Sequence, residues 1–292
     1  MHLASGPIAK LHTALNADQQ AQYALPMGDQ VIDLMPYIGQ FLRLEHLGDI
    51  QCVGCGRAIR KSFQQGYCFP CTQRLAQCDL CIVKPERCHY HLGTCREPEW
   101  GEQHCMQAHY VYLANSSGLK VGITRAQNIP HRWIDQGATS ALCIAQVSQR
   151  RIAGLLEVEI AQHVADKTNW RKMLQGDPEP IDLADWRDRL WDQVQSVVQS
   201  LQTDFGAESI RFLADQAPVD IQYPVLHYPA KISSHNLLKN PVVTGQLQAI
   251  KGQYLLLDTG VLNVRKFAGF HLKIAANAYS LSSNYSPGCK RR

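Results

Sequence analysis

The stretch HYVYLANSSGLKVGITRAQNIPHRW, residues 109–133, decides the fold of this chain. Two runs rich in β-branched and aromatic residues flank NSSG at residues 115–118, a sequence typical of a turn, so the stretch predicts a β-hairpin. Because side chains alternate across a strand, Val111 and Val121 lie on one face and Tyr112 lies on the other. We expect the valine face to be a core and the tyrosine face to be a polar surface.

The residues that follow the hairpin extend this unit. An apolar run at residues 141–147 predicts the third strand of the same sheet. Residues 150–165 show the helical period, with one apolar stripe. GDPEP, residues 176–180, separates that helix from a second amphipathic helix, whose expected N-cap is Asp182. The predicted fold class is α+β, with a zinc-ribbon region, then a small three-stranded antiparallel sheet with helices, then a small C-terminal β unit.

Four cysteines before the hairpin have the spacing of a zinc ribbon. They form two C-x2-C pairs separated by twelve residues: Cys52, Cys55, Cys68 and Cys71. Two such pairs can place four thiolates at the corners of a tetrahedron, and the short spacers let backbone amides face the sulfur atoms. Because the set leaves no open ligand position, we expect a structural zinc ion here.

Five further cysteines follow at once, interspersed with histidines. They are Cys78, Cys81, Cys88, Cys95 and Cys105. We expect a second zinc ion, held by Cys78 and Cys81 together with two of the other three, and His89 is the alternative ligand. A cysteine and histidine pair that acts as a nucleophile is another interpretation that the sequence leaves open.

The composition is that of an ordinary globular protein. Of the 292 residues, 45% are hydrophobic and 18% are charged, which excludes a disordered class. A net charge of +4 permits a nucleic-acid partner but does not require one. No apolar run reaches the length of a membrane span, and residues 1–20 lack a signal-peptide pattern. We therefore expect a cytoplasmic protein with no membrane partner, whose cysteines bind metal instead of forming disulfides.

Composition also divides the chain into four segments. We expect an N-terminal β and helical lead at residues 1–50, a double zinc-binding region at 51–108, an α/β domain at 109–206 and a C-terminal β unit at 207–292. Within the first segment we expect a short helix at residues 10–23. Residues 39–45 faintly echo residues 252–258, through chance or through a duplicated β unit. A duplication would bring the two ends of the chain together.

Three motifs in the hairpin and the loop after it resemble the opening of the GIY-YIG nuclease domain. They are Tyr110-Val111-Tyr112, Lys120-Val121-Gly122 and Asn128-Ile129-x-x-Arg132. Glu157 and Asn169 follow at the spacing of the later signature, so the resemblance covers residues 110–171. Lys120 stands where the family usually has tyrosine, and Gln136 stands near the place of a family histidine. The whole chain, cysteines included, also resembles an uncharacterised bacterial family, domain of unknown function 2797.

The first resemblance implies a divalent-metal-dependent phosphodiesterase that acts on DNA or RNA. By position, Tyr112 helps to activate water, Arg132 steadies phosphate charge and Glu157 holds Mg²⁺ or Mn²⁺. Asn169 assists Glu157, and Lys120 can touch a phosphate as a cation. The implied site residues are therefore Tyr112, Lys120, Gly122, Arg132, Glu157 and Asn169.

Several alternatives stay open. The helical stripe favours Glu159 as the functional carboxylate, whereas the spacing to Asn169 favours Glu157. Two other functions compete with the nuclease: a zinc-ribbon module that binds nucleic acid without cutting it, and a zinc-stabilised scaffold for protein interactions. The basic residues of the C-terminal segment form either a basic surface or ordinary solvated charges: Lys251, Arg265, Lys266 and Lys273.

Overall fold

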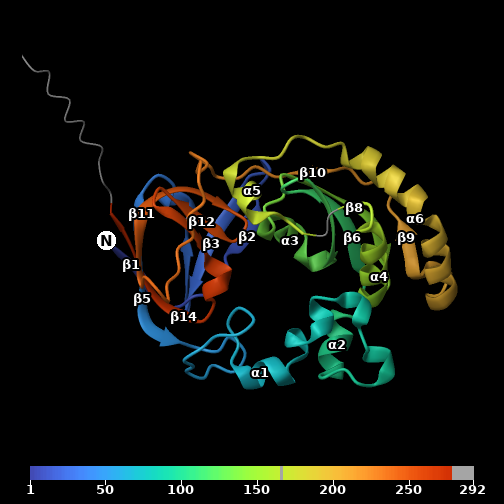
Figure 1. Ribbon diagram of the computed structural model, residues 1–292, viewed down its shortest axis with the longest axis horizontal. Helices are drawn as coiled ribbons and strands as arrows, with labels where there is room; N and C mark the ends of the chain where they lie inside the picture. The colour runs from blue at the N-terminus through green and yellow to red at the C-terminus, as the bar shows by residue number, and fades with distance from the viewer. Residues whose placement is uncertain (165–166, 278–292) are drawn as a thin grey trace, which may run out of the picture.

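The computed structural model describes residues 1–164 and 167–277. The end of the predicted C-terminal β unit, residues 278–292, lies outside the described residues. Helices and antiparallel sheets are both present, so the α+β class is confirmed. Figure 1 shows a β unit on one side, an α/β unit on the other, and the cysteine-rich region below both. Within the described ranges, no helix is long and apolar enough to cross a membrane.

The predicted hairpin lies at the centre of the α/β unit. Strands β6 (His109–Asn115) and β7 (Leu119–Arg125) pair antiparallel, and β8 (Ser140–Val147) pairs with the other edge of β6. The sheet has five strands instead of the predicted three, because β9 (Ile210–Phe212) and β10 (Val219–Asp220) pair with β8. These two short strands provide hydrogen-bond partners for backbone groups along the outer edge of β8, which the prediction left unpaired.

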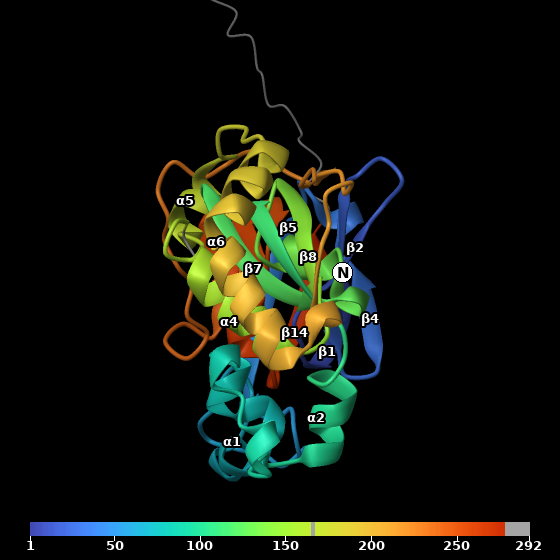
Figure 2. The ribbon, with the colours of Figure 1, turned by 90° about the vertical axis from the view of Figure 1, so that its right-hand side faces the viewer.

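Two helices cover the valine face of this sheet, as Figure 2 shows. They are α4 (Arg150–Ile160) and α6 (Leu183–Phe205). Val111 and Val121 are fully buried against them, so the predicted register of the hairpin is confirmed. Asp182 is the N-cap of α6, as predicted, because its carboxylate accepts hydrogen bonds from two backbone amides of the first turn.

The tyrosine face is buried as well, so the expected polar surface is wrong. Helix α3 (His131–Asp135) and the β unit share a core with this face, and Tyr112 has no exposed surface. Lys120 and Thr124 are each only 5% exposed. The hairpin therefore lies between two cores, because segments distant in the sequence close over the face that was expected to meet water.

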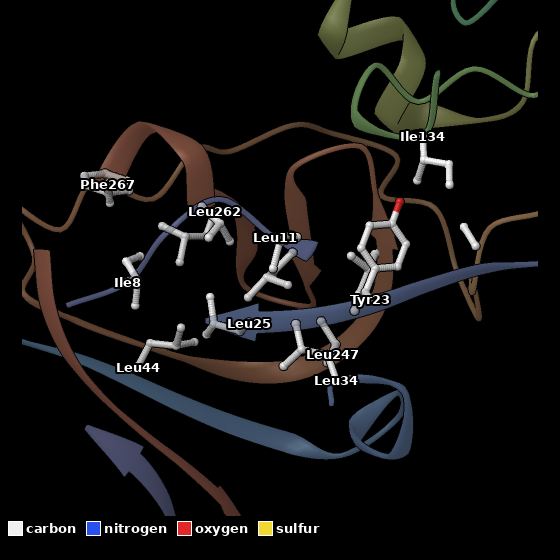
Figure 3. Close-up of a cluster of buried hydrophobic side chains, with 14 of the residues drawn as sticks. Ile8, Leu11, Tyr23, Leu25, Leu34, Leu44, Ile134, Leu247, Leu262 and Phe267 are labelled. Carbon is white, nitrogen blue, oxygen red and sulfur yellow. The ribbon is translucent and has the colours of Figure 1, made fainter. Parts of the chain in front are cut away.

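The β unit contains both ends of the described chain. Its strands are β1 (His2–Pro7), β2 (His12–Leu15), β3 (Ala21–Met27), β4 (Gln30–Asp33), β5 (Phe41–Ile50), β11 (Val242–Lys251), β12 (Tyr254–Leu257), β13 (Gly260–Asn263) and β14 (Phe270–Asn277). One sheet has the order β1-β14-β5-β11-β12-β13 and another has the order β2-β3-β4. Leu25 and Leu247 from opposite ends of the sequence meet in one core, and Ile134 of α3 enters the same core (Figure 3). The two ends of the chain therefore pack together.

The helix expected at residues 10–23 is wrong, because this segment contains β2 and the start of β3. Every second residue of β3 is buried, which is the period of a strand and not of a helix. The side chain of Asn16 accepts hydrogen bonds from the backbone amides of Asp18 and Gln20. These bonds form a turn, and the chain reverses there instead of continuing as a helix.

The cysteine-rich region and the loops hold only short helices. The α-helices among them are α1 (Phe69–Arg74), α2 (Pro98–His104) and α5 (Trp170–Gln175). The 3-10 helices are η1 (Met35–Tyr37), η2 (Ala76–Cys78), η3 (Leu80–Ile82), η4 (Pro85–Arg87), η5 (Tyr90–Leu92), η6 (Ala126–Asn128), η7 (Ala207–Ser209) and η8 (Val264–Phe267). With so little regular structure, we expect this region to depend on its cysteines for order.

Replacement of Val121 by aspartate is expected to unfold the α/β unit. The new carboxylate would lie in an apolar core, at a cost to the free energy of unfolding of about 4 kcal/mol or more. Urea denaturation followed by circular dichroism measures the loss. The matched control is Val158→Asp, because Val158 is 48% exposed on α4 and a carboxylate there stays in water. Equal stabilities of the two variants would contradict the register.

Candidate metal centre and phosphate site

Cys52, Cys55, Cys68 and Cys71 come together in the structure. Their four sulfur atoms all lie within 4.8 Å of one another. The Sγ atoms of Cys55 and Cys68 are 3.8 Å apart. Sulfur atoms at the corners of a tetrahedron, each about 2.3 Å from zinc, are also about 3.8 Å apart. This group, which we call the first metal centre, can therefore hold a metal ion such as zinc.

Backbone amides prepare the thiol of Cys52 for a metal ion. The N–H of Cys68 donates to Sγ of Cys52 at 3.1 Å. Burial opposes ionisation of Cys52, but hydrogen bonds from this amide and from those of Cys55 and Gly54 bring its pKa down to about 6. Zinc binds the thiolate form of cysteine, so this lowering favours a metal. The turn includes Gly56, whose φ of +73° lies in the left-handed region that favours glycine.

The other five cysteines separate into two places. Four of them line one small cavity, together with Asp79 and His89: Cys81, Cys88, Cys95 and Cys105. Cys78 is not among the residues of that cavity. Burial raises the pKa of the Cys78 thiol, the positive charge of Arg96 offsets part of that rise, and the thiolate of Cys52 and the carboxylate of Glu97 add to it. The backbone is extended at Asp79, between the two 3-10 turns that contain Cys78 and Cys81.

A chain of hydrogen bonds links Tyr112 to Arg132. Gln136 lies between them, with its side-chain nitrogen directed to Oη of Tyr112 at 2.8 Å. Its side-chain oxygen then accepts from Nη2 of Arg132 at 3.2 Å and from Nε at 3.3 Å. The residue near the place of the family histidine therefore orients the arginine.

Tyr112 is held in its neutral form. Burial raises the pKa of its phenol, and the positive charge of Arg132 only partly offsets that rise. Gly122 lies directly opposite in the hairpin, and a Cβ atom there would be 2.5 Å from Oη of Tyr112. Only glycine at this position leaves room for the tyrosine ring, so Gly122 serves to place Tyr112.

Two further arginines lie close enough to Arg132 to be affected by its charge. Arg150 begins α4, and Arg265 belongs to η8 of the β unit. Burial lowers the pKa of both guanidinium groups, and the charge of Arg132 lowers it further. Among the described residues, the buried Nε of Arg150 has no hydrogen-bond partner. We call Arg132, Arg150 and Arg265 the arginine group.

Gln253 joins the two elements that carry Arg132 and Arg265. Its side chain is 3% exposed and donates from Nε2 to Oδ1 of Asp135, at the end of α3, at 2.8 Å. Its carbonyl oxygen accepts from the N–H of Val264, at the start of η8, at 2.9 Å. One buried residue therefore fixes the arginine of the α/β unit relative to the arginine of the β unit.

Glu157 brings a carboxylate to this group. Its charge adds to the effect of burial in raising the pKa of Tyr112, and it also acts on Arg150. Glu159, the residue that the helical stripe favoured, instead accepts a hydrogen bond from Nε2 of Gln162 at 2.8 Å. The structure thus associates Glu157 with Tyr112 and with the arginine group.

Residues 39–272 match a family model described as "Protein of unknown function (DUF2797)". The chain belongs to the DUF2797 family. The match includes both groups of cysteines, the hairpin and the whole arginine group. No curated protein and no solved structure matches this DUF2797 chain. The chemistry of the site therefore has to be argued from its geometry.

Lys120 and Asn169 lie at the hairpin turn of the DUF2797 protein. Lys120 donates from Nζ to Oγ1 of Thr168 at 3.5 Å. The Oδ1 atom of Asn169 accepts from the N–H of Lys172 as the N-cap of α5, and the N–H of Asn169 donates to Oγ of Ser117. These contacts attach α5 to the hairpin. The functional roles that the resemblance implies for Lys120 and Asn169 stay predictions.

Proposed function

We propose that this DUF2797 protein binds nucleic-acid phosphates at the arginine group and cleaves the phosphodiester bond with a divalent metal ion. The observation that carries the proposal is that Arg150 and Arg265, both partly buried, have pKa values lowered by burial and by the charge of Arg132. Like charges repel and burial disfavours each of them. The carboxylates of Glu157 and Asp135 oppose this effect, yet the pKa of Arg150 and that of Arg265 stay lowered, so a bound anion would be favoured. A phosphodiester is such an anion, and the paired N–H donors of arginine match its oxygen atoms.

Hydrolysis also needs a ligand for the divalent metal ion, which Glu157 would supply. Its carboxylate is a hard oxygen ligand of the kind that Mg²⁺ and Mn²⁺ prefer, and a bound ion would polarise the phosphate. Arg132 would offset the charge that develops on the phosphate oxygen atoms in the transition state. Gln136 orients that arginine before substrate arrives, which reduces the ordering needed during the reaction.

A second candidate, binding without cleavage, is favoured by the position of Tyr112. The hydroxyl group is fully buried and bonded to Gln136, and burial raises its pKa. A neutral phenol with no access to water is a poor proton acceptor at neutral pH. In this candidate Tyr112 positions Gln136 and Arg132, and it does not activate water.

Incubation of the purified protein with labelled DNA and RNA pools distinguishes the two candidates. The pools are offered with Mg²⁺, with Mn²⁺ and with a chelator. Cleavage that depends on the divalent ion supports hydrolysis, whereas tight binding without cleavage supports the binding module. If neither occurs with any pool, both candidates are wrong and a scaffold for protein interactions is the remaining alternative.

Replacement of Arg132 by alanine is expected to weaken nucleic-acid binding by about tenfold or more, because a charge-assisted phosphate contact is lost. The slope of log K against log salt concentration should also fall by about 1, since one fewer counterion is released. Fluorescence anisotropy at several salt concentrations measures both quantities. The control is Arg189→Ala, because the Arg189 side chain is 64% exposed on α6 and pairs with Asp185. Equal effects of the two substitutions would contradict the proposed phosphate site.

A further inference from the structure

We propose that Asp79, Cys81 and His89 bind a zinc ion at a second metal centre. The ligand atoms of these three side chains all lie within 4.8 Å of one another. Asp79 lies in extended backbone between η2 and η3, Cys81 lies within η3, and His89 precedes η5. The sequence predicted Cys81 and, as an alternative, His89 as ligands here, but it did not predict Asp79. This site is independent of the proposed phosphodiesterase function.

The separation of Asp79 and His89 is that of two ligands of one zinc ion. The Oδ2 atom of Asp79 and the Nε2 atom of His89 are 3.4 Å apart. A charge-assisted hydrogen bond between two such groups is shorter, at about 2.7–2.9 Å. Two ligand atoms that each lie about 2.1 Å from zinc, at the tetrahedral angle, are about 3.4 Å apart. An ion between the two atoms therefore accounts for this distance better than a direct hydrogen bond does.

The contacts of His89 leave its Nε2 atom with a lone pair for the metal. The Nδ1 atom lies 2.7 Å from Oγ1 of Thr94, and that hydroxyl group donates to the carbonyl oxygen of His89 at 3.3 Å. Because the hydroxyl group has a single proton, its oxygen accepts a hydrogen bond from Nδ1–H. In the neutral ring, Nε2 then carries no proton and can bind a metal ion.

Arg96 orients the carboxylate of Asp79 without using all of its acceptor positions. Its Nε atom donates to Oδ2 of Asp79 at 2.7 Å, and its Nη1 atom donates to the carbonyl oxygen of Thr72 at 2.9 Å. A carboxylate has about four acceptor positions, so that of Asp79 can accept from arginine and also bind a metal ion. Hydrogen-bonded partners of this kind commonly hold metal ligands in place.

The cavity at these residues has the size of one ion. Its volume is about 20 Å³, and Asp79, Cys81 and His89 are among the residues that line it. A carboxylate, a thiolate and a neutral imidazole together carry a double negative charge, which one divalent ion balances. Oxygen, sulfur and nitrogen atoms of these three types are the ligands that zinc uses. The set leaves a fourth position, which water can reach because the side chain of His89 is 29% exposed.

Metal analysis of the full-length wild-type protein, purified with zinc in every buffer, is the first test. We expect two zinc ions per chain, one at each metal centre. X-ray absorption at the zinc edge should show nitrogen or oxygen neighbours at about 2.0–2.1 Å, beside sulfur neighbours at about 2.3 Å. One zinc ion per folded chain would overturn the proposal. Sulfur neighbours alone would overturn it as well, because they would mean that thiols hold both ions.

Substitution of His89 by glutamine is the second test. His89 is only partly buried, so the variant is expected to fold and to retain one of the two zinc ions. The matched control is His91→Gln, which should retain both. His91 belongs to the neighbouring η5, is not among the residues that line the cavity, and has its Nε2 atom 3.2 Å from Nη1 of Arg151.

Two cysteine variants complete this test. Cys81→Ser should retain one zinc ion, whereas Cys95→Ser, a change in the wall of the same cavity, should retain two. If His89→Gln retains both ions, or if Cys95→Ser loses one while Cys81→Ser does not, the ligand set is wrong. If a variant does not fold, the zinc count and the X-ray absorption of the wild type still decide the question.

Discussion

Substitution of Cys52 by serine is expected to leave no soluble, folded protein. We expect the first metal centre to hold together a region with little regular structure, and Sγ of Cys52 also accepts a hydrogen bond from the backbone N–H of Cys68. Structural zinc sites contribute about 10–16 kcal/mol to folding in small peptides. That range matches or exceeds the roughly 5–15 kcal/mol by which a whole domain is stable. Loss of one ligand should therefore remove most of the free energy of unfolding.

The measurement for Cys52→Ser is the soluble yield, together with the melting temperature of any protein that remains. The matched control is Cys143→Ala. Cys143 is a buried thiol in β8, and burial raises its pKa to about 12, so it stays protonated and does not favour a metal. The control should be soluble and should keep its zinc. A soluble Cys52→Ser protein with an unchanged melting temperature would show that the first metal centre is not structural.

The parts of the fold that could be predicted are those in which neighbouring residues determine the structure. The hairpin follows from two alternating runs on either side of a turn, and the presence of Val111 and Val121 in one core, with Tyr112 in the other, confirms its register. The first metal centre follows from regular cysteine spacing, because a C-x2-C turn brings two sulfur atoms to one point within a few residues. The second group of cysteines has irregular spacing, so only the folded chain shows which of them line one cavity.

The arginine group could not be predicted, because it depends on contacts between distant segments. Arg132 lies on α3 and Arg265 on η8, and these elements are joined by packing between the α/β unit and the β unit and by Gln253, which no local pattern reports. Arg265 was expected only as one of several basic residues of the C-terminal segment. Lys251, from the same set, is fully buried and donates to Oδ1 of Asp177 at 2.7 Å. Similar side chains in one segment thus have different roles, which the fold decides.

Replacement of Glu157 by glutamine is expected to lower metal-dependent cleavage by at least about 100-fold, if the protein is the proposed phosphodiesterase. Glutamine keeps the size of the side chain but removes the charge that recruits the cation, so an electrostatic contribution to the transition state is lost. Nucleic-acid binding should persist, because the arginine group contacts phosphate without that carboxylate. Single-turnover cleavage and fluorescence anisotropy, carried out on the same preparation, separate the two effects.

Glu159→Gln is the control for this experiment, because Glu159 lies on the same helix and bonds to Gln162. We expect it to cleave at the wild-type rate. Loss of activity in Glu159→Gln with full activity in Glu157→Gln would mean that the helical stripe identifies the metal ligand. A loss of binding in Glu157→Gln would mean instead that the carboxylate orders the arginines. Because Glu157 acts on both Tyr112 and Arg150, unchanged binding is the result that assigns its charge to the metal ion and to catalysis.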